Sequence, residues 1–307
     1  MNKIHFVMIL AVALSINACY TKKQQATVNE PSITETLYFG QKPPGLIPEV
    51  FAPGIVSVNG RFEGAITFSP DLDEMYFGAD NEHEATEIYF SKREGNQWTS
   101  ITKVNFTKGK DDEEMHPFVS PDGKSIYFTA HSPASPEPKI WEVKRLGNAW
   151  SNAVKLDSPI NVDPIFYPNQ SKNGDLFYFN LSNFKTYYAS RKNNSFSEAK
   201  EVDIPFGHHG FIAPSQEYLV ITSRNKEDAH RKDNDIYVYF KKQDGGWTKP
   251  IHLGAEINSN FNEKCPSITP DGNYLFFGRD ERNEEPGLSN IHWVSTEVIH
   301  QLKPTNL

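Results

Sequence analysis

The stretch PSITPDGNYLFFGRD, residues 266–280, is one of five copies of a pattern that decides the fold. In each copy a short apolar run leads into a turn, and a run rich in aromatic residues follows. Proline presets φ for a turn and glycine accepts positive φ, so each copy predicts a β-hairpin. The other copies are ITFSPDLDEMYFGAD (66–80), PFVSPDGKSIYFTAH (117–131), PNQSKNGDLFYFNLS (168–182) and GFIAPSQEYLVITSR (210–224).

The spacing of the copies predicts a β-propeller. Successive copies begin 51, 51, 42 and 56 residues apart, which is the length of one four-stranded blade. Behind the first four hairpins lies a second strand pattern that ends in an aromatic residue. We expect these aromatic residues to pack between neighbouring blades, and a sugar-binding platform is the alternative. They are Trp98, Trp150, Phe196 and Trp247.

The two ends of the chain predict how the ring closes. Residues 37–57 resemble the outer half of a repeat, notably residues 235–259, whereas the last hairpin is followed only by NIHWVSTEVIH (290–300). An N-terminal strand that completes the last blade would remove two exposed sheet edges. We therefore expect one all-β domain over residues 36–307, a single propeller of four-stranded antiparallel blades with five blades, and six as the alternative.

The Ser-Pro-Asp-Gly hairpins, with the Ile-Tyr or Ile-Trp strands that follow them, resemble the Pro-Asp repeat of TolB-type, WD-like bacterial propellers. The resemblance covers roughly residues 36–303. It implies a periplasmic or surface propeller that is used for binding and that has no shared catalytic set.

The first residues resemble a bacterial lipoprotein signal peptide, residues 1–18. Lys3 precedes an apolar stretch from Phe6 to Leu14, and small residues lead to Cys19. The resemblance implies that Cys19 becomes the lipidated first residue, and an ordinary secretory peptide is the alternative. Residues 19–35 are polar and without periodicity, which predicts a flexible tether to a bacterial envelope membrane. We expect the outer membrane, with the leaflet left open.

Composition narrows the classes of partner. The formal net charge of −8 argues against nucleic acid, because phosphate binding requires a basic surface. Only Cys19 and Cys265 are present, so no disulfide is expected inside the propeller. No nucleophile elbow, phosphate loop or dinucleotide fingerprint is present, so we expect no cofactor.

Candidate site residues come from aligning the five hairpins on their turns. One aligned position holds Ala65, His116, Tyr167, His209 and Cys265 at the start of the innermost strands. The preceding position holds Gly64, Met115, Phe166, His208 and Lys264, and the one before that holds Glu63, Glu114, Ile165, Gly207 and Glu263. These positions diverge into titratable types, which is typical of an asymmetric site on a symmetric scaffold.

Two interpretations of these residues stay open. In one, they converge on a mouth of the central channel and bind a polar ligand or a metal, with His116, His209 and Cys265 as nitrogen and sulfur ligands for zinc. In the other, they are partly solvated residues that hydrogen-bond to their neighbours, and the site holds no metal. The candidate ligand-binding residues are Glu63, Glu114, His116, Tyr167, His208, His209, Glu263 and Lys264.

The loops that leave the second strand of each hairpin form a second candidate surface, a loop rim. Four of them are long, at residues 80–86, 131–138, 224–234 and 280–289, and Arg224 and Arg279 would make two of them basic. With no catalytic motif, we interpret the chain as a lipid-anchored module that binds an envelope protein or glycan. The alternative is a glycan-active hydrolase or lyase that uses the carboxylates and histidines at the channel mouth.

Overall fold

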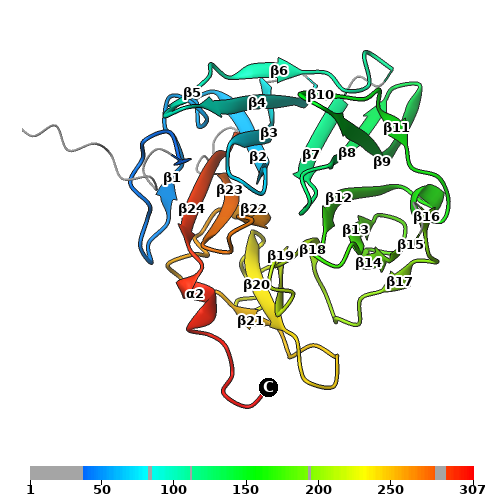
Figure 1. The fold of residues 1–307 in the computed structure, drawn as a ribbon. Helices are drawn as coiled ribbons and strands as arrows, with labels where there is room; N and C mark the ends of the chain where they lie inside the picture. The colour runs from blue at the N-terminus through cyan, green and yellow to red at the C-terminus, as the bar shows by residue number, and fades with distance from the viewer. Residues whose placement is uncertain (1–36, 82–84, 111–112, 193–194, 281–287) are drawn as a thin grey trace, which may run out of the picture. The chain divides into compact units, whose positions relative to one another are not determined.

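The computed structural model describes residues 37–81, 85–110, 113–192, 195–280 and 288–307. These residues form five antiparallel sheets of four or five strands, arranged as the blades of a propeller (Figure 1). The prediction of an all-β, five-bladed propeller is therefore confirmed. Among the described residues no helix is both long and apolar enough to cross a membrane.

Each blade begins with its innermost strand. Blade 1 contains β2 (Arg61–Phe68), β3 (Glu74–Asn81), β4 (Glu87–Glu94), β5 (Gln97–Trp98) and β6 (Thr102–Val104). Blade 2 contains β7 (Glu113–Val119), β8 (Ser125–Ser132), β9 (Ser135–Leu146), β10 (Ala149–Trp150) and β11 (Val154–Lys155). Blade 3 contains β12 (Ile165–Gln170), β13 (Leu176–Asn180), β14 (Lys185–Ala189) and β17 (Lys200–Glu201), with a small hairpin of β15 (Arg191–Lys192) and β16 (Ser195–Phe196).

Blade 4 contains β18 (His208–Ile212), β19 (Tyr218–Arg224), β20 (Asn234–Phe240) and β21 (Ile251–His252). Blade 5 contains β22 (Asn262–Ile268), β23 (Tyr274–Asp280), β24 (Asn290–Ser295) and β1 (Glu49–Val50). Two short helical turns complete the described elements, η1 (Ile160–Val162) and α2 (Glu297–His300).

Ring closure by an N-terminal strand is confirmed. Strand β1 pairs antiparallel with β24, so that Glu49 lies opposite Trp293. The next residue, Phe51, donates its backbone N–H to the carbonyl of Ile291 at 2.8 Å. Its ring packs edge-on against Trp293 with centroids 5.2 Å apart. The last blade thus gains its outer strand from the other end of the chain, and its edge is covered.

The hairpin turns behave as their sequences predict. Gly123 has a φ of 68° and Gly272 has a φ of 80°. Where the sequence lacks glycine at this position, Leu72 and Gln216 adopt the same left-handed conformation, with φ of 62° and 61°. The copy at 210–224 departs most from the pattern, yet it still forms the β18–β19 hairpin.

Of the aromatic residues that end the second pattern, Trp150 packs between blades, as expected. It belongs to blade 2, and its indole Nε1 donates to the hydroxyl of Tyr76 in blade 1 at 3.1 Å. The guanidinium of Arg145 lies 4.1 Å from the Trp150 ring and also pairs with Glu74 of blade 1. Trp98 stacks on Phe39 of the N-terminal segment, with centroids 4.6 Å apart. The contacts of Trp150 and Arg145 fix blades 1 and 2 against each other.

Candidate functional site

The innermost strand of each blade carries a bulge at the same place. The pairing register shifts after Gly64, Met115, Phe166, His208 and Lys264. The residue that follows has a left-handed backbone in every blade, with φ of 47° at Ala65, 52° at His116, 61° at Tyr167, 48° at His209 and 50° at Cys265. A bulge bends its strand and redirects a side chain. The five aligned positions are therefore structurally equivalent, and four of them carry a functional group.

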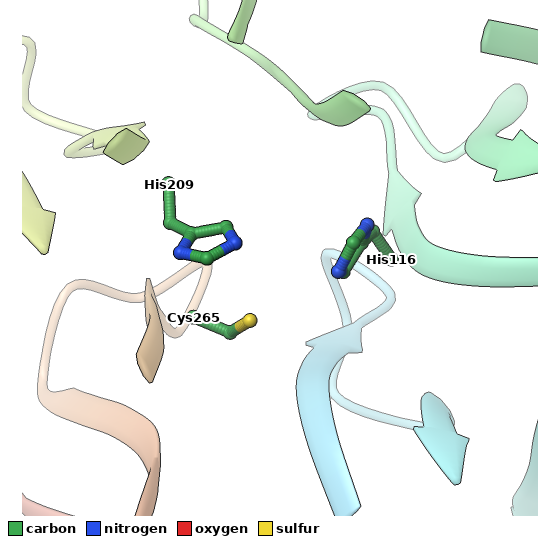
Figure 2. Close-up of side chains that lie close together, drawn as sticks. All are labelled: His116, His209 and Cys265. Atoms are coloured by element: carbon green, nitrogen blue, oxygen red, sulfur yellow. The ribbon is translucent and has the colours of Figure 1, made fainter. Parts of the chain in front are cut away.

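The bulges bring three of these side chains together. One ring nitrogen each from His116 and His209 and the sulfur of Cys265 all lie within 4.8 Å of one another. Figure 2 shows the three side chains pointing into a common space from separate strands, β7, β18 and β22. Tyr167 completes the cluster: its ring centroid lies 4.9 Å from that of His209, and its hydroxyl donates to the carbonyl of Pro266.

Burial controls the protonation of this cluster. Desolvation lowers the pKa of His116 to about 3. Burial also holds the pKa of His209 well below its ordinary value, and the charges of His208, His116 and Lys264 act in the same direction. The buried Cys265 thiol has its pKa raised to about 12, mainly by desolvation. Both imidazoles are therefore neutral near pH 7, each with a lone pair on one ring nitrogen.

A hydrogen-bonded chain of side chains orients His209. Its Nδ1 lies 3.0 Å from Nδ1 of His208, and His208 hydrogen-bonds to the side chain of Asn234. The amide nitrogen of Asn234 donates to Asn262 at 3.1 Å. The contact between the two Nδ1 atoms places the His209 ring and leaves Nε2 of His209 outside this hydrogen bond.

A cavity of about 360 Å³ opens beside the cluster. His116 and Cys265 contribute to its wall. The other lining residues are Phe62, Gly64, Gly78, Asp80, Thr86 and Met115. We call this end of the channel the histidine mouth. Above the ring of Phe62 lies Nζ of Lys264, at 5.5 Å from the centroid, and Lys264 also pairs with Asp280 at 2.6 Å. The cavity thus combines an aromatic face, an aliphatic face and charged groups.

The three candidate glutamates face the connections between blades. Oε1 of Glu63 accepts from the backbone N–H of Val58 and from Nε of Arg61, both at 2.9 Å. Glu114 accepts from two backbone N–H groups, those of Phe106 at 3.0 Å and Thr107 at 2.7 Å. These carboxylates hold the segment that enters their own blade. Among the described residues they do not line the cavity of the histidine mouth.

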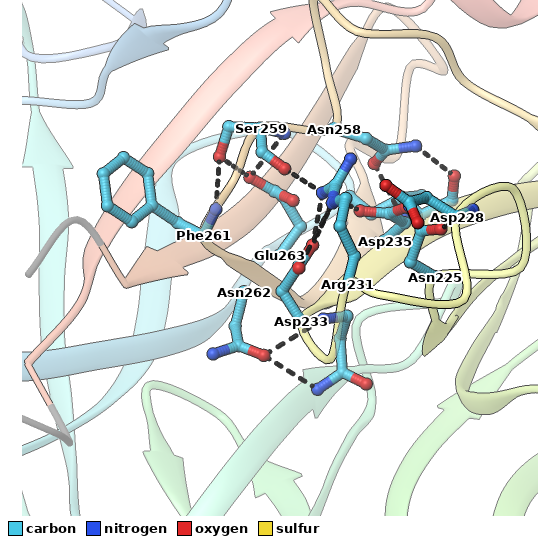
Figure 3. A network of polar contacts seen from close by, with 12 residues as sticks. Asn225, Asp228, Arg231, Asp233, Asp235, Asn258, Ser259, Phe261, Asn262 and Glu263 are labelled. Atoms are coloured by element: carbon cyan, nitrogen blue, oxygen red, sulfur yellow. Dashed lines mark hydrogen bonds and ion pairs between the residues drawn. The ribbon is translucent and has the colours of Figure 1, made fainter. Parts of the chain in front are cut away.

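Glu263 has the same role within a larger polar network, shown in Figure 3. It accepts from the Ser259 hydroxyl at 2.6 Å and from Nε of Arg279 at 2.8 Å. In the same network Arg231 pairs with Asp233 and Asp235. Burial raises the pKa of Glu63 and of Glu263 to about 7, although hydrogen bonds and a neighbouring arginine act against this shift in each case.

The loop rim differs from the expectation. Arg279 belongs to strand β23 rather than to a loop, and its side chain bonds Glu263 and the carbonyl of Ile257. Arg224 is exposed at the end of β19.

The prediction of a loop at 131–138 was wrong, because β8 and β9 pair as far as Ser132 and Ser135. Proline is tolerated there because the strands lie beside a bulge at the end of a hairpin. Residues 82–84 and 281–287 of two other loops lie outside the described residues.

The alignment of repeats found the histidines but missed much of the cavity wall. Phe62 was not predicted as a site residue, and Asp80 and Thr86 were predicted only as the ends of a rim loop, not as part of the channel mouth. The pairing register of β2 and β3 would have indicated these residues. Phe62 lies opposite Asp80 in this pair, and Gly64 lies opposite Gly78. Residues on the second strand that face the aligned positions would have been found by pairing each hairpin around its turn.

Comparison with known proteins agrees with the fold. No family model and no curated protein matches the sequence. The catalytic domain of the Coprinopsis cinerea GH62 alpha-L-arabinofuranosidase is similar in structure, with a TM-score of 0.52, 8% identity and coverage of 83% of this chain and 98% of that chain. The Bacillus licheniformis GH43 protein BlXynB has a TM-score of 0.50 and 11% identity, over 82% of this chain and 57% of that one.

TolB from Acinetobacter baumannii is also among the similar structures. Its TM-score is 0.48 at 14% identity, and the match covers 75% of this chain and 56% of that chain. The chain therefore spans little more than half the length of this TolB. At these identities, the arabinofuranosidase domain and BlXynB show the fold alone.

Proposed function

We propose that the protein is a membrane-anchored β-propeller of a bacterial envelope that binds a ligand in the histidine mouth. The observation that carries this proposal is the cavity of about 360 Å³, which lies within the range of sites for small ligands. It lies at the end of the channel where the loops that leave the second strands begin, because Asp80 and Thr86 line it. A rigid scaffold with loops at one end is a common arrangement for recognition.

The lining favours a sugar ring as the ligand. Phe62 offers a half-buried aromatic face, Met115 an aliphatic one, and Asp80 and Thr86 offer hydrogen-bonding groups. Sugars present both an apolar face of C–H groups and a rim of hydroxyls, so they match a wall that combines aromatic and polar groups. The positive charge of Lys264 is paired with Asp280. We therefore propose a neutral envelope glycan as the ligand.

Binding without catalysis is the function that we favour. A glycosidase of the usual kind requires two carboxyl groups about 5–10 Å apart across the bond that it cleaves. Asp80 is the one carboxylate among the described residues that line the cavity. Glu63, Glu114 and Glu263 are engaged by backbone N–H groups, a hydroxyl and arginines.

Calorimetric titration with a panel of neutral oligosaccharides from bacterial cell envelopes tests this proposal. We expect saturable binding by the wild type and at least about tenfold weaker binding by Phe62→Ala, which removes the aromatic face. Phe184→Ala is the matched control, because Phe184 is 70% exposed and belongs to blade 3. Loss of binding in both variants, or binding of no sugar, would contradict the proposal. Release of new reducing ends would establish the hydrolase instead.

The anchor is a separate part of the proposal. Cys19 lies outside the described residues, so its lipidation rests on the sequence alone. We expect wild-type protein in the membrane fraction and Cys19→Ser protein in the soluble envelope fraction, because several acyl chains on one cysteine hold a protein to a bilayer. Equal membrane association of both proteins would refute the anchor without affecting the sugar site.

A further inference from the structure

The cluster of His116, His209 and Cys265 has the donor set of a transition-metal site. Two imidazole nitrogens and one sulfur lie within 4.8 Å of one another, and each comes from a different blade. Imidazole and thiolate are the ligands that zinc prefers, whereas calcium and magnesium require oxygen. In addition, Nδ1 of His116 is buried and has no hydrogen-bond partner among the described residues. A buried polar atom without a partner points to a group that the protein is built to hold.

The surroundings orient one of the donors, His209. Nδ1 of His209 hydrogen-bonds with Nδ1 of His208, so Nε2 is the His209 nitrogen that remains to bind a metal. Histidines that bind metals usually donate their other N–H to a fixed acceptor, which sets the tautomer and the ring orientation. Figure 2 shows one ring nitrogen of His209 facing the space between the three side chains.

The backbone is strained at the three proposed ligands. His116, His209 and Cys265 have φ between 48° and 52°, a conformation that costs a residue with a Cβ about 1–2 kcal/mol. Glycine would relieve this strain, and the chain uses glycine at many other positions of positive φ. Ala65 and Tyr167 adopt the same conformation without being proposed ligands, so the strain belongs to the bulge of every blade, and the residue types at three bulges make the site.

We propose that His116, His209 and Cys265 bind one Zn²⁺ ion, with a fourth coordination position directed to the cavity of the histidine mouth. Binding replaces the S–H bond of Cys265 with an S–Zn bond and releases the proton to solvent. Zn–N bonds of about 2.0 Å and a Zn–S bond of about 2.3 Å place ligand atoms about 3.3–3.5 Å apart. The three side chains therefore close by about 1 Å around the ion. Three protein ligands with one open position are typical of zinc sites that bind a further molecule.

Metal binding goes beyond the proposed function, because it is measured without any sugar. The purified full-length protein is treated with chelator and titrated with Zn²⁺ in a calorimeter, and Co²⁺ is then used as a spectroscopic substitute. We expect one Zn²⁺ per chain, no binding of Ca²⁺, and a thiolate-to-cobalt charge-transfer band in the near ultraviolet. Absence of stoichiometric Zn²⁺ binding, or a cobalt spectrum without the thiolate band, would overturn the proposal.

Variants separate this site from surface histidines. Cys265→Ser and His116→Ala are expected to weaken Zn²⁺ binding by about 100-fold or more, because each removes a ligand. His208→Ala acts only through His209, and we expect a loss of about tenfold. His230→Ala is the control, since His230 is exposed on the loop after β19. Circular dichroism and thermal melting establish that each variant is folded, and Cys265→Ala replaces Cys265→Ser if the serine variant unfolds. Unchanged affinity in the folded ligand variants would show adventitious binding and would refute the site.

If sugar binding fails while Zn²⁺ binds as expected, the proposed function is wrong and the metal site stands. If Zn²⁺ fails to bind while sugar binding depends on Phe62, the metal site is wrong and the sugar site stands. The two proposals therefore have separate outcomes in the same preparation of protein.

Discussion

The two mouths of the channel are built by the same five hairpins, yet the blades resemble one another at only one of them. The opposite end, which we call the turn mouth, has a cavity of about 250 Å³ lined by the hairpin turns. Four blades place a proline there, at Pro70, Pro121, Pro214 and Pro270. At the histidine mouth the five equivalent positions carry four different residue types, in Ala65, His116, Tyr167, His209 and Cys265.

The difference teaches where a repeat protein carries its chemistry. At the turn mouth the shared residues set backbone conformation, and the wall between them is largely apolar, with Phe118, Phe211 and Ile268. At the histidine mouth a shared bulge redirects side chains of unlike chemistry toward one point. The scaffold is thus repeated, while the residues that it presents are not.

The largest expected effect concerns the turn mouth. Phe118 is 8% exposed and packs edge-on against Phe211, with centroids 5.8 Å apart. We expect Phe118→Ala to lower the free energy of unfolding by about 3 kcal/mol, because it leaves a hole in the core. Zn²⁺ affinity should decrease far less than in the ligand variants, because Phe118 contributes no ligand atom, although it lies two residues from His116 on β7. Denaturant unfolding and Zn²⁺ titration measure both quantities, and a folded variant with a large loss of affinity would show that the mouths are coupled.

A smaller effect concerns pH and Glu63. The pKa of Glu63 is raised from 4.5 to about 7 in the folded protein. Between these two pH values the Glu63 carboxyl is protonated in the folded state and ionised in the unfolded state. The contribution of Glu63 to stability is therefore largest at low pH and decreases as the pH rises through about 7. Lowering the pH from about 8 to about 5.5 should stabilise the wild type by about 2 kcal/mol relative to Glu63→Gln.

This comparison has to be made as a difference between the two proteins. Desolvation lowers the pKa values of His116 and His208, so their contribution has the opposite sign and is lost as the pH falls from their unfolded pKa toward their folded pKa. It is the same in both proteins and cancels. Urea unfolding of each protein at several pH values gives the difference, and an equal pH dependence of the two would contradict the raised pKa of Glu63.

Much of the fold was predictable because its signals are local. Each hairpin turn is encoded within a few residues, as Ser120, Pro121, Asp122 and Gly123 illustrate, and the interval between turns gives the blade. Ring closure was also predictable, because the strand that contains Glu49 and Val50 lacks a partner within its own repeat.

The site was predictable only to the level of aligned positions. The alignment placed His116, His209 and Cys265 at equivalent points, but the bulge that turns them together is a property of backbone pairing and leaves no glycine in the sequence. In the sequence, Glu63 and Glu263 are as plausible site residues as the histidines, because they are titratable and lie two positions before an aligned position. Two positions apart on a regular strand, side chains point to the same face, but the bulges after Gly64 and Lys264 break this alternation, and the glutamates bond to the segments between blades instead.

The smallest effect tests the strain at the bulge itself. Ala65 occupies the bulge position of blade 1 with a φ of 47° and contributes no ligand atom. Ala65→Gly removes the cost of the left-handed conformation, which is about 1–2 kcal/mol. It also adds a cost of about 0.5–1 kcal/mol, because glycine loses more conformational entropy on folding. The expected result is a free energy of unfolding that is unchanged or higher by up to about 1 kcal/mol. Ala79→Gly is the matched control, because Ala79 is fully buried in the neighbouring strand β3, has no positive φ and should lose about 1 kcal/mol. Equal losses in the two variants would mean that the bulge stores no strain, and the cost argued for the positions of His116, His209 and Cys265 would then be absent.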